Sequence, residues 1–205
     1  MKMRTKVCLA ELSTDEAVNL LKDGNKRFIN NLRFNRNLLQ QVNDTIDQQY
    51  PFAVIISCMD SRTSAELIFD QGLGDIFSIR VAGNIINEEI LGSAEFACKV
   101  VGAKVVMVLG HSGCTAILGA VNKVDIGHMY FITDKIKRCI DQATFEPLAQ
   151  DRETLLNHVT RKNVFQGIAD LKNESEILRQ MAEEKKIKIL GGVYDVSSGL
   201  VDFFE

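Results

Sequence analysis

A chain of 205 residues is long enough for one well-buried hydrophobic core and short for two, so one domain over residues 1–205 is expected. A formal net charge of −3 gives no electrostatic case for binding nucleic acid or an anionic membrane, and no apolar run approaches the ~18 residues of a membrane span. The five cysteines are odd in number and irregularly spaced, which argues against a disulfide framework and favours a reducing compartment, by default the cytoplasm.

The N-terminal part of the chain predicts helices. Its start has no apolar run that would make it a signal peptide. Residues 13–16, Ser-Thr-Asp-Glu, form a capping box that predicts a helix through Phe28 with one apolar stripe. Residues 30–49 are polar, with isolated Phe34 and Leu38, and look like an arm that covers a partner subunit. We therefore expect a helical dimerisation arm over residues 1–49 and an α/β core over residues 50–205.

The rest of the chain alternates between strand and helix patterns. Three short, continuous apolar runs suit parallel strands that are buried on both faces: 52–57, 76–82 and 104–109. Helical patterns lie between and after them: 64–70, 88–101, 114–122, 128–145 and 151–185. Residues 187–196 return as a strand, followed by a turn and an edge. This order predicts an α/β fold with a mainly parallel central sheet flanked by helices.

Two polar segments follow directly after apolar runs. The first is Cys58-Met-Asp60-Ser-Arg62 and the second is His111-Ser-Gly-Cys114. Since ligands gather at the carboxyl ends of parallel strands, we expect the fold to bring the two segments together. Two thiolates and one imidazole are a set of three ligands, and catalytic zinc takes three protein ligands with one position left open. The sequence therefore predicts a zinc enzyme that activates water.

Other interpretations of these residues exist. The cysteines could be buried thiols, His111 a core histidine, and Asp60 and Arg62 a structural ion pair. A cysteine phosphatase needs five residues between its cysteine and arginine, whereas three separate Cys58 from Arg62. The glycine-rich patterns of nucleotide-binding loops are absent. Cys8, Cys98 and Cys139 are expected to be packing or surface residues, and His128 and His158 are expected to be solvated on helices.

The two polar segments together resemble the metal motifs of the β-class carbonic anhydrases. The resemblance covers nearly the whole chain: Gly24–Phe28 is similar to the family's first helix, 75–84 to its Glu-x-Phe-x-x-Arg-Asn-x-Ala-Asn stretch, and 192–195 to its last strand. It implies a four-stranded parallel core plus an edge strand, and a homodimer or tetramer whose N-terminal arms embrace the partner. It also implies one zinc ion per chain and reversible hydration of CO₂ to bicarbonate.

Carried over by position, the resemblance makes Cys58, His111 and Cys114 the zinc ligands. Asp60 and Arg62 become a catalytic dyad, in which Asp60 orients the zinc-bound hydroxide that attacks CO₂. If Arg62 releases Asp60, the carboxylate can reach the metal, so Asp60 is expected as a metal ligand only in a closed state.

The same comparison assigns five substrate-binding positions: Gln49, Phe77, Ala82, Phe96 and Gly113. Ala82 stands where a valine is common and Phe96 where a tyrosine is common, and Thr-Ala replaces Gly-Gly at 115–116. Ile55 stands where some bacterial members carry the tryptophan of an inhibitory bicarbonate site, although Arg80 matches that site's arginine.

Two alternatives to carbonic anhydrase activity remain open at this point. One is a catalytically silent zinc-bound anion sensor or assembly protein on the same fold. It is motivated by the departures from the family pattern at Ala82, Phe96 and residues 115–116. The other is a relative that hydrolyses a different small heteroallene such as CS₂. A CO₂ hydration assay combined with zinc analysis separates the three.

Overall fold

The computed structural model describes residues 6–140 and 151–204. In this part of the chain, fourteen elements are named in the following order: α1 Lys6–Glu11, α2 Thr14–Ile29, α3 Leu38–Asp44, β1 Ala53–Ser57, α4 Ala65–Ile68, β2 Ile76–Arg80, α5 Glu88–Glu95, β3 Val105–His111, α6 Thr115–Val121, α7 Met129–Lys137, α9 Arg152–Glu174, α10 Glu176–Glu183, β4 Lys188–Tyr194 and β5 Val201–Phe204. None of the helices in these two ranges is long and apolar enough to cross a membrane.

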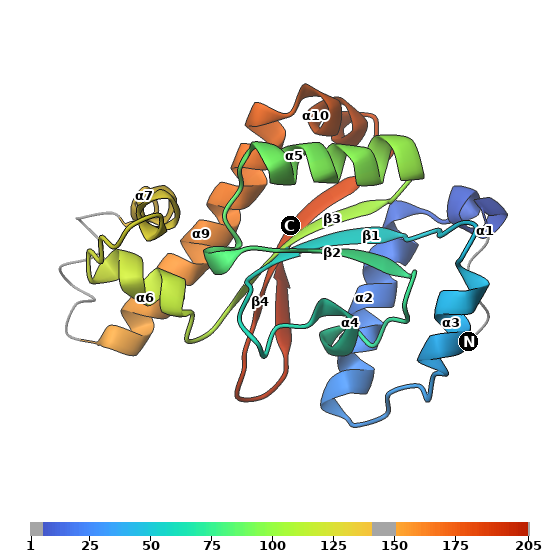
Figure 1. The fold of residues 1–205 in the computed structure, drawn as a ribbon, viewed down its shortest axis with the longest axis horizontal. Coiled ribbons are helices and arrows are strands. Elements are labelled where there is room, and N and C mark those ends of the chain that lie inside the picture. The colour runs from blue at the N-terminus through green and yellow to red at the C-terminus, as the bar shows by residue number, and fades with distance from the viewer. Residues whose placement is uncertain (1–5, 141–150, 205) are drawn as a thin grey trace.

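The five strands form one sheet in the order β2-β1-β3-β4-β5 (Figure 1). The first four strands are mutually parallel and β5 pairs with β4 in the antiparallel direction. The prediction of a mainly parallel sheet with an added edge strand is therefore confirmed. Strands β1 and β3 are buried at every position, as expected for apolar runs that are covered on both faces.

Helices cover both faces of the sheet (Figure 1). Helices α2 and α4 pack on one face, where their apolar side chains join those of β1 and β3 in one core cluster. Helices α5, α9 and α10 pack on the opposite face in a second cluster. A third cluster lies beyond the carboxyl ends of the strands, where α6 and α7 meet the start of α9. This third cluster includes Cys58 and Cys114, so the predicted metal ligands lie in a packed end of the sheet.

Two predicted helices differ from the observed ones. The α-helix predicted over 88–101 ends at Glu95 and continues as a π-helical turn, Phe96–Val101. The helix predicted over 151–185 is two helices, because Ser175 has an extended backbone and caps α10 by accepting the Leu178 N–H at 3.1 Å. Its hydroxyl also donates to Glu95 at 2.6 Å, a tertiary contact without a local sequence signal. The end of the helix predicted over 128–145 lies outside the described residues.

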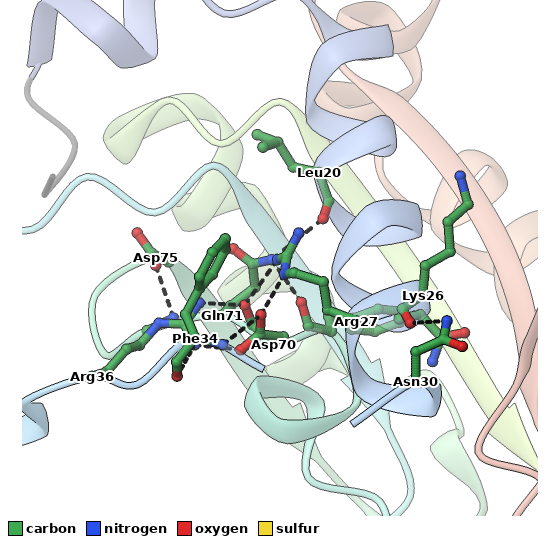
Figure 2. Close-up of polar contacts among 12 residues, drawn as sticks. Leu20, Lys26, Arg27, Asn30, Phe34, Arg36, Asp70, Gln71 and Asp75 are labelled. Atoms are coloured by element: carbon green, nitrogen blue, oxygen red, sulfur yellow. Dashed lines mark hydrogen bonds and ion pairs between the residues drawn. The ribbon is translucent and has the colours of Figure 1, made fainter. Parts of the chain in front are cut away.

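A cluster of charged residues fixes the segment between α2 and α3 to the core (Figure 2). The buried carboxylate of Asp70 accepts hydrogen bonds from Arg27 Nε at 2.5 Å and from Arg36. The Arg27 guanidinium also lies 4.4 Å from the centre of the Phe34 ring. Burial would raise the pKa of Asp70, but the hydrogen bonds from Arg36 and Arg27 outweigh it and hold that pKa below its usual value. Beyond this cluster, α3 has no buried residue.

Helix α2 lies unusually close to α4, and Gly24 makes this approach possible. A Cβ atom at Gly24 would lie 1.7 Å from the carbonyl oxygen of Phe69. We expect Gly24→Ala to destabilise the protein by about 3 kcal/mol or more, because backbone must move to relieve the overlap. The matched control is Gly92→Ala in α5, where a Cβ meets no atom within 4 Å. Its better helix propensity should stabilise by about 1 kcal/mol. Urea unfolding of both variants measures the difference, and equal stabilities would contradict the packing argument.

Candidate metal centre

Cys58, His111 and Cys114 lie together at the carboxyl ends of two neighbouring strands. Cys58 follows β1 directly, His111 is the last residue of β3, and Cys114 is the N-cap of α6. Strands β1 and β3 are neighbours in the sheet. The chain continues from β1 to β2 and from β3 to β4, which lie toward opposite edges of the sheet. Such a point in an open α/β sheet is where ligand sites form. The ligand atoms of the three residues lie within 4.8 Å of one another, so the sequence prediction that the fold brings them together is confirmed.

The geometry and chemistry of this group fit a zinc ion. The two sulfur atoms are 3.9 Å apart. Two sulfurs bound to tetrahedral zinc at 2.3 Å would be separated by about 3.8 Å. His111 Nδ1 lies 3.0 Å from the carbonyl oxygen of Ser112, which assigns the proton to Nδ1. His111 Nε2 is then a lone-pair donor, buried and without a hydrogen-bond partner in the described structure. An orphaned nitrogen beside two sulfurs is the signature of a metal-binding set.

The two thiols contact each other. Their hydrogen bond lowers the pKa of Cys58; burial opposes this shift, while the Gly83 backbone N–H adds to it. The same contact and burial raise the pKa of Cys114. A bound cation would displace the thiol protons, because the thiolate is the form that binds metal.

Asp60 and Arg62 form a two-point ion pair next to this group. Arg62 Nε donates to Oδ1 of Asp60 and Nη2 donates to Oδ2, both at 2.9 Å. The Arg62 backbone N–H also donates to Oδ1 at 3.0 Å. The side-chain hydrogen bond from Arg62 holds the pKa of Asp60 well below its usual value. In the part of the chain that is described, Asp60 is not among the residues whose ligand atoms converge, so its carboxylate belongs to Arg62.

Two further side chains fix the loop that carries Cys58 and Asp60. Thr63 Oγ1 donates to the carbonyl oxygens of Cys58 and Asp60 at 2.8 and 2.9 Å. Arg80 donates to the same two carbonyls from β2, at 3.2 Å in the case of Cys58. The sequence had suggested a role for Arg80 only in the inhibitory bicarbonate site of some bacterial relatives. Its contact with this loop depends on β2 lying beside β1.

Comparison with known proteins agrees with this geometry. A family model described as carbonic anhydrase matches residues 53–201. Carbonic anhydrase 2 of Mycobacterium tuberculosis is 30% identical over 188 residues, covering 87% of each chain. The carbonic anhydrase of Mycolicibacterium smegmatis is 32% identical over 188 residues, covering 89% of each.

The chain belongs to the β-carbonic anhydrase family. Solved β-carbonic anhydrases share its fold. The enzyme CafA of Aspergillus fumigatus aligns with a TM-score of 0.75 at 23% identity, over 82% of this chain and 81% of that one. A tetrameric β-carbonic anhydrase of Sordaria macrospora aligns with a TM-score of 0.71 at 24% identity, over 92% and 93%.

Within this β-carbonic anhydrase fold, two of the five expected substrate positions lie near the carboxyl ends of the strands and two lie along β2. Ala82 packs in the same cluster as Cys58 and Cys114. Gly113 is exposed in the loop between His111 and Cys114, with a φ of +67°. Phe77 and Phe96 line a groove of about 400 Å³ along β2, and no metal-ligand candidate borders this groove.

Gln49 lies at the opposite end of the strands from the metal ligands. It lines a cavity of about 460 Å³ at the amino ends of β1 and β3, together with Val100 and Lys104. Strand β1, which is five residues long, separates it from Cys58. That length alone corresponds to about 16 Å. The single chain therefore does not bring Gln49 to its own metal centre.

Several residues around this β-carbonic anhydrase centre escaped sequence reasoning. Ser112 Oγ accepts the Val196 N–H at 3.0 Å and lies 3.3 Å from Asp195 Oδ1, which ties the loop after His111 to the end of β4. His158, expected to be solvated, has a buried Nε2 without a partner in the described residues, whereas His128 is exposed as expected. These contacts join distant segments of the chain, so no local sequence pattern predicts them.

Proposed function

We propose that this protein catalyses the reversible hydration of CO₂ to bicarbonate and a proton, with one zinc ion held by Cys58, His111 and Cys114. The observation that carries the proposal is the convergence of these three ligand atoms within 4.8 Å beside a paired carboxylate. Zinc held by these residues would lower the pKa of a coordinated water and so supply a nucleophile.

The dyad orients that nucleophile in this proposal. An ionised carboxylate only accepts hydrogen bonds, and the lowered pKa keeps Asp60 ionised throughout the neutral range. Arg62 donates two hydrogen bonds to Oδ1 of Asp60 and one to Oδ2, which leaves a lone pair on Oδ2 to accept a hydrogen bond from a donor at the open coordination position. Arg62 also holds the carboxylate away from the ligands. Release by Arg62 would free Asp60 to close the site.

The substrate would enter an apolar slot. CO₂ is small and apolar, so Ala82 need only exclude water beside the ligands, where Gly113 leaves open space. Phe77 and Phe96 line the separate groove along β2, so we propose that they exclude water only in a slot shared with a neighbouring subunit. For Gln49 we propose a polar contact with the substrate from a neighbouring subunit, since it lies far from its own centre.

A direct test combines stopped-flow CO₂ hydration with zinc analysis of the same purified protein. We expect about one zinc per chain and rapid hydration. A protein that binds zinc but hydrates no CO₂ would refute the proposed activity and favour the silent anion sensor. We also propose the cytoplasm as the compartment, because the proposed metal site needs reduced thiols.

We further propose that the chain forms a homodimer or a tetramer through its arm, residues 1–49. Six large apolar side chains on the arm are between 46% and 75% exposed: Leu32, Phe34, Leu38, Leu39, Val42 and Ile46. Several exposed apolar side chains on one segment are typical of a subunit interface. The Sordaria relative, whose fold this chain shares, is described as tetrameric.

A charge placed on the arm should therefore weaken assembly. We expect Leu39→Asp, at a side chain that is 71% exposed, to shift the protein toward a monomer of 22.9 kDa in light scattering at micromolar concentration. Ile126→Asp is the matched control, because Ile126 is 68% exposed but lies outside the arm, before α7. Equal oligomeric states in the two variants would exclude this face of the arm as the interface.

A further inference from the structure

A hydrogen-bonded connection runs from α9 to one sulfur of the metal centre. Asn163 is buried, and its Nδ2 donates to the carbonyl oxygen of Gly83 at 2.8 Å. The backbone N–H of Gly83 donates to Cys58 Sγ at 3.4 Å. A side chain 105 positions after Cys58 in the sequence (163 minus 58) is thus two contacts away from its sulfur.

Gly83 needs support from outside its own turn. Its φ is +67° and that of Asn84 is +43°, so two successive residues lie in the left-handed region. Such backbone is sparsely populated and persists where surrounding contacts fix it. A Cβ at Gly83 would also lie 2.8 Å from Ile136 Cδ1 and 3.2 Å from Ala116 Cβ, so the turn is tightly packed as well as strained.

The Asn163 amide is itself held at both ends. Its Nδ2 bonds Gly83, while its Oδ1 accepts a weak hydrogen bond from the Cys139 thiol at 3.9 Å. Burial keeps that thiol protonated, because it raises the pKa of Cys139 to about 11. The orientation of the amide is therefore fixed with its N–H toward the Gly83 carbonyl.

We propose that Asn163 is a positioning residue for the metal centre, which acts through Gly83 to keep an N–H group on the Cys58 sulfur. The inference rests on the proposed function, because it takes Cys58 as a zinc ligand. A hydrogen bond to a ligating sulfur stabilises its lone pairs and reduces the charge that it donates, which leaves the metal a stronger Lewis acid. Asn163 thus tunes the metal without touching it.

Cobalt substitution tests this electronic role, because thiolate-to-cobalt charge-transfer absorption reports the energy of the sulfur lone pairs. Asn163→Ala removes the amide, and Asn163→Leu keeps a branched side chain of similar size without an N–H. We expect both variants to shift the charge-transfer band to longer wavelength. They should also weaken zinc binding about 10-fold in a chelator competition, because the Gly83 turn beside Cys58 loses the contact that holds it in place.

Thr133→Ala is the matched control. Thr133 is as buried as Asn163, but its hydroxyl bonds only carbonyls of α7 and of Val124. Its band position and zinc affinity should equal those of the wild type. A comparable band shift in Thr133→Ala, or no shift in either Asn163 variant, would overturn the inference while leaving the metal site in place. A wild type without any thiolate-to-cobalt band would instead refute the proposed metal site itself.

A second measurement needs no variant. In wild-type protein loaded with ¹¹³Cd, we expect a scalar coupling between the metal and the Gly83 amide proton, transmitted through the Cys58 sulfur. If the cadmium couples to the cysteine protons but not to the Gly83 amide proton, the N–H···S contact does not exist and the inference fails.

Discussion

Cys58→Ser, His111→Ala and Cys114→Ser are each expected to lose most of the bound zinc. Each substitution removes one of three converging ligand atoms and leaves the other two buried around the gap. Losing an outer contact typically costs 10- to 100-fold in metal affinity, so losing a ligand should cost more than about 100-fold. Metal analysis after dialysis against a chelator gives the zinc content per chain, and CO₂ hydration should fall with it.

Cys98→Ser is the matched control for the thiol substitutions. Cys98 is buried like the two ligand candidates, but burial alone raises its pKa to about 12 and it lies in the π-helical turn behind the sheet. This variant should keep about one zinc per chain. Full zinc retention in any of the three ligand variants would remove that residue from the proposed set.

Asp60→Ala and Arg62→Ala are expected to keep zinc and to lower kcat for CO₂ hydration by about 100-fold, within the range for a misplaced catalytic group. Neither side chain supplies one of the three converging ligand atoms. The pKa of Asp60 lies below its usual value, so the carboxylate is ionised at neutral pH and, in the proposed mechanism, would accept a hydrogen bond from the nucleophile. Stopped-flow rates at pH 7 to 9, with zinc content measured on the same samples, give the result.

Asp202→Asn provides the control for this pair. Asp202 forms an ion pair with Arg161 at 2.5 Å on the surface, away from the third cluster that holds the cysteines. Exposed ion pairs contribute little to stability, and this variant should hydrate CO₂ at the wild-type rate. Wild-type rates in both Asp60→Ala and Arg62→Ala would reduce the dyad to an architectural role.

The sequence predicted those parts of the fold and site that depend on local patterns. The apolar run before Cys58 predicted β1, and the one before His111 predicted β3, because a strand covered on both faces needs an uninterrupted run. Once both strands were assigned to one parallel sheet, convergence of the two polar segments followed from topology. The capping box at Ser13 predicted the start of α2, and both of its hydrogen bonds are present.

The remainder depends on contacts between distant segments. The break at Ser175 is supported by Glu95, and the Gly83 turn is held by Asn163, each pair 80 positions apart. Arg80 reaches the Cys58 loop only because β2 lies beside β1. A sequence pattern contains no information about these distances until the order of the strands is known. For the same reason, the position of Gln49 relative to the metal ligands followed only from the structure.

The placement of Gln49 at the amino ends of the strands has a consequence for how the protein behaves in a cell. If Gln49 contacts substrate, each working centre is built from two chains, one that supplies the metal and one that supplies the amide. Turnover per chain would then depend on protein concentration and would decline on dilution below the dissociation constant of the dimer. Newly made chains would stay inactive until they meet a second copy, so expression level would govern CO₂ hydration more steeply than in direct proportion.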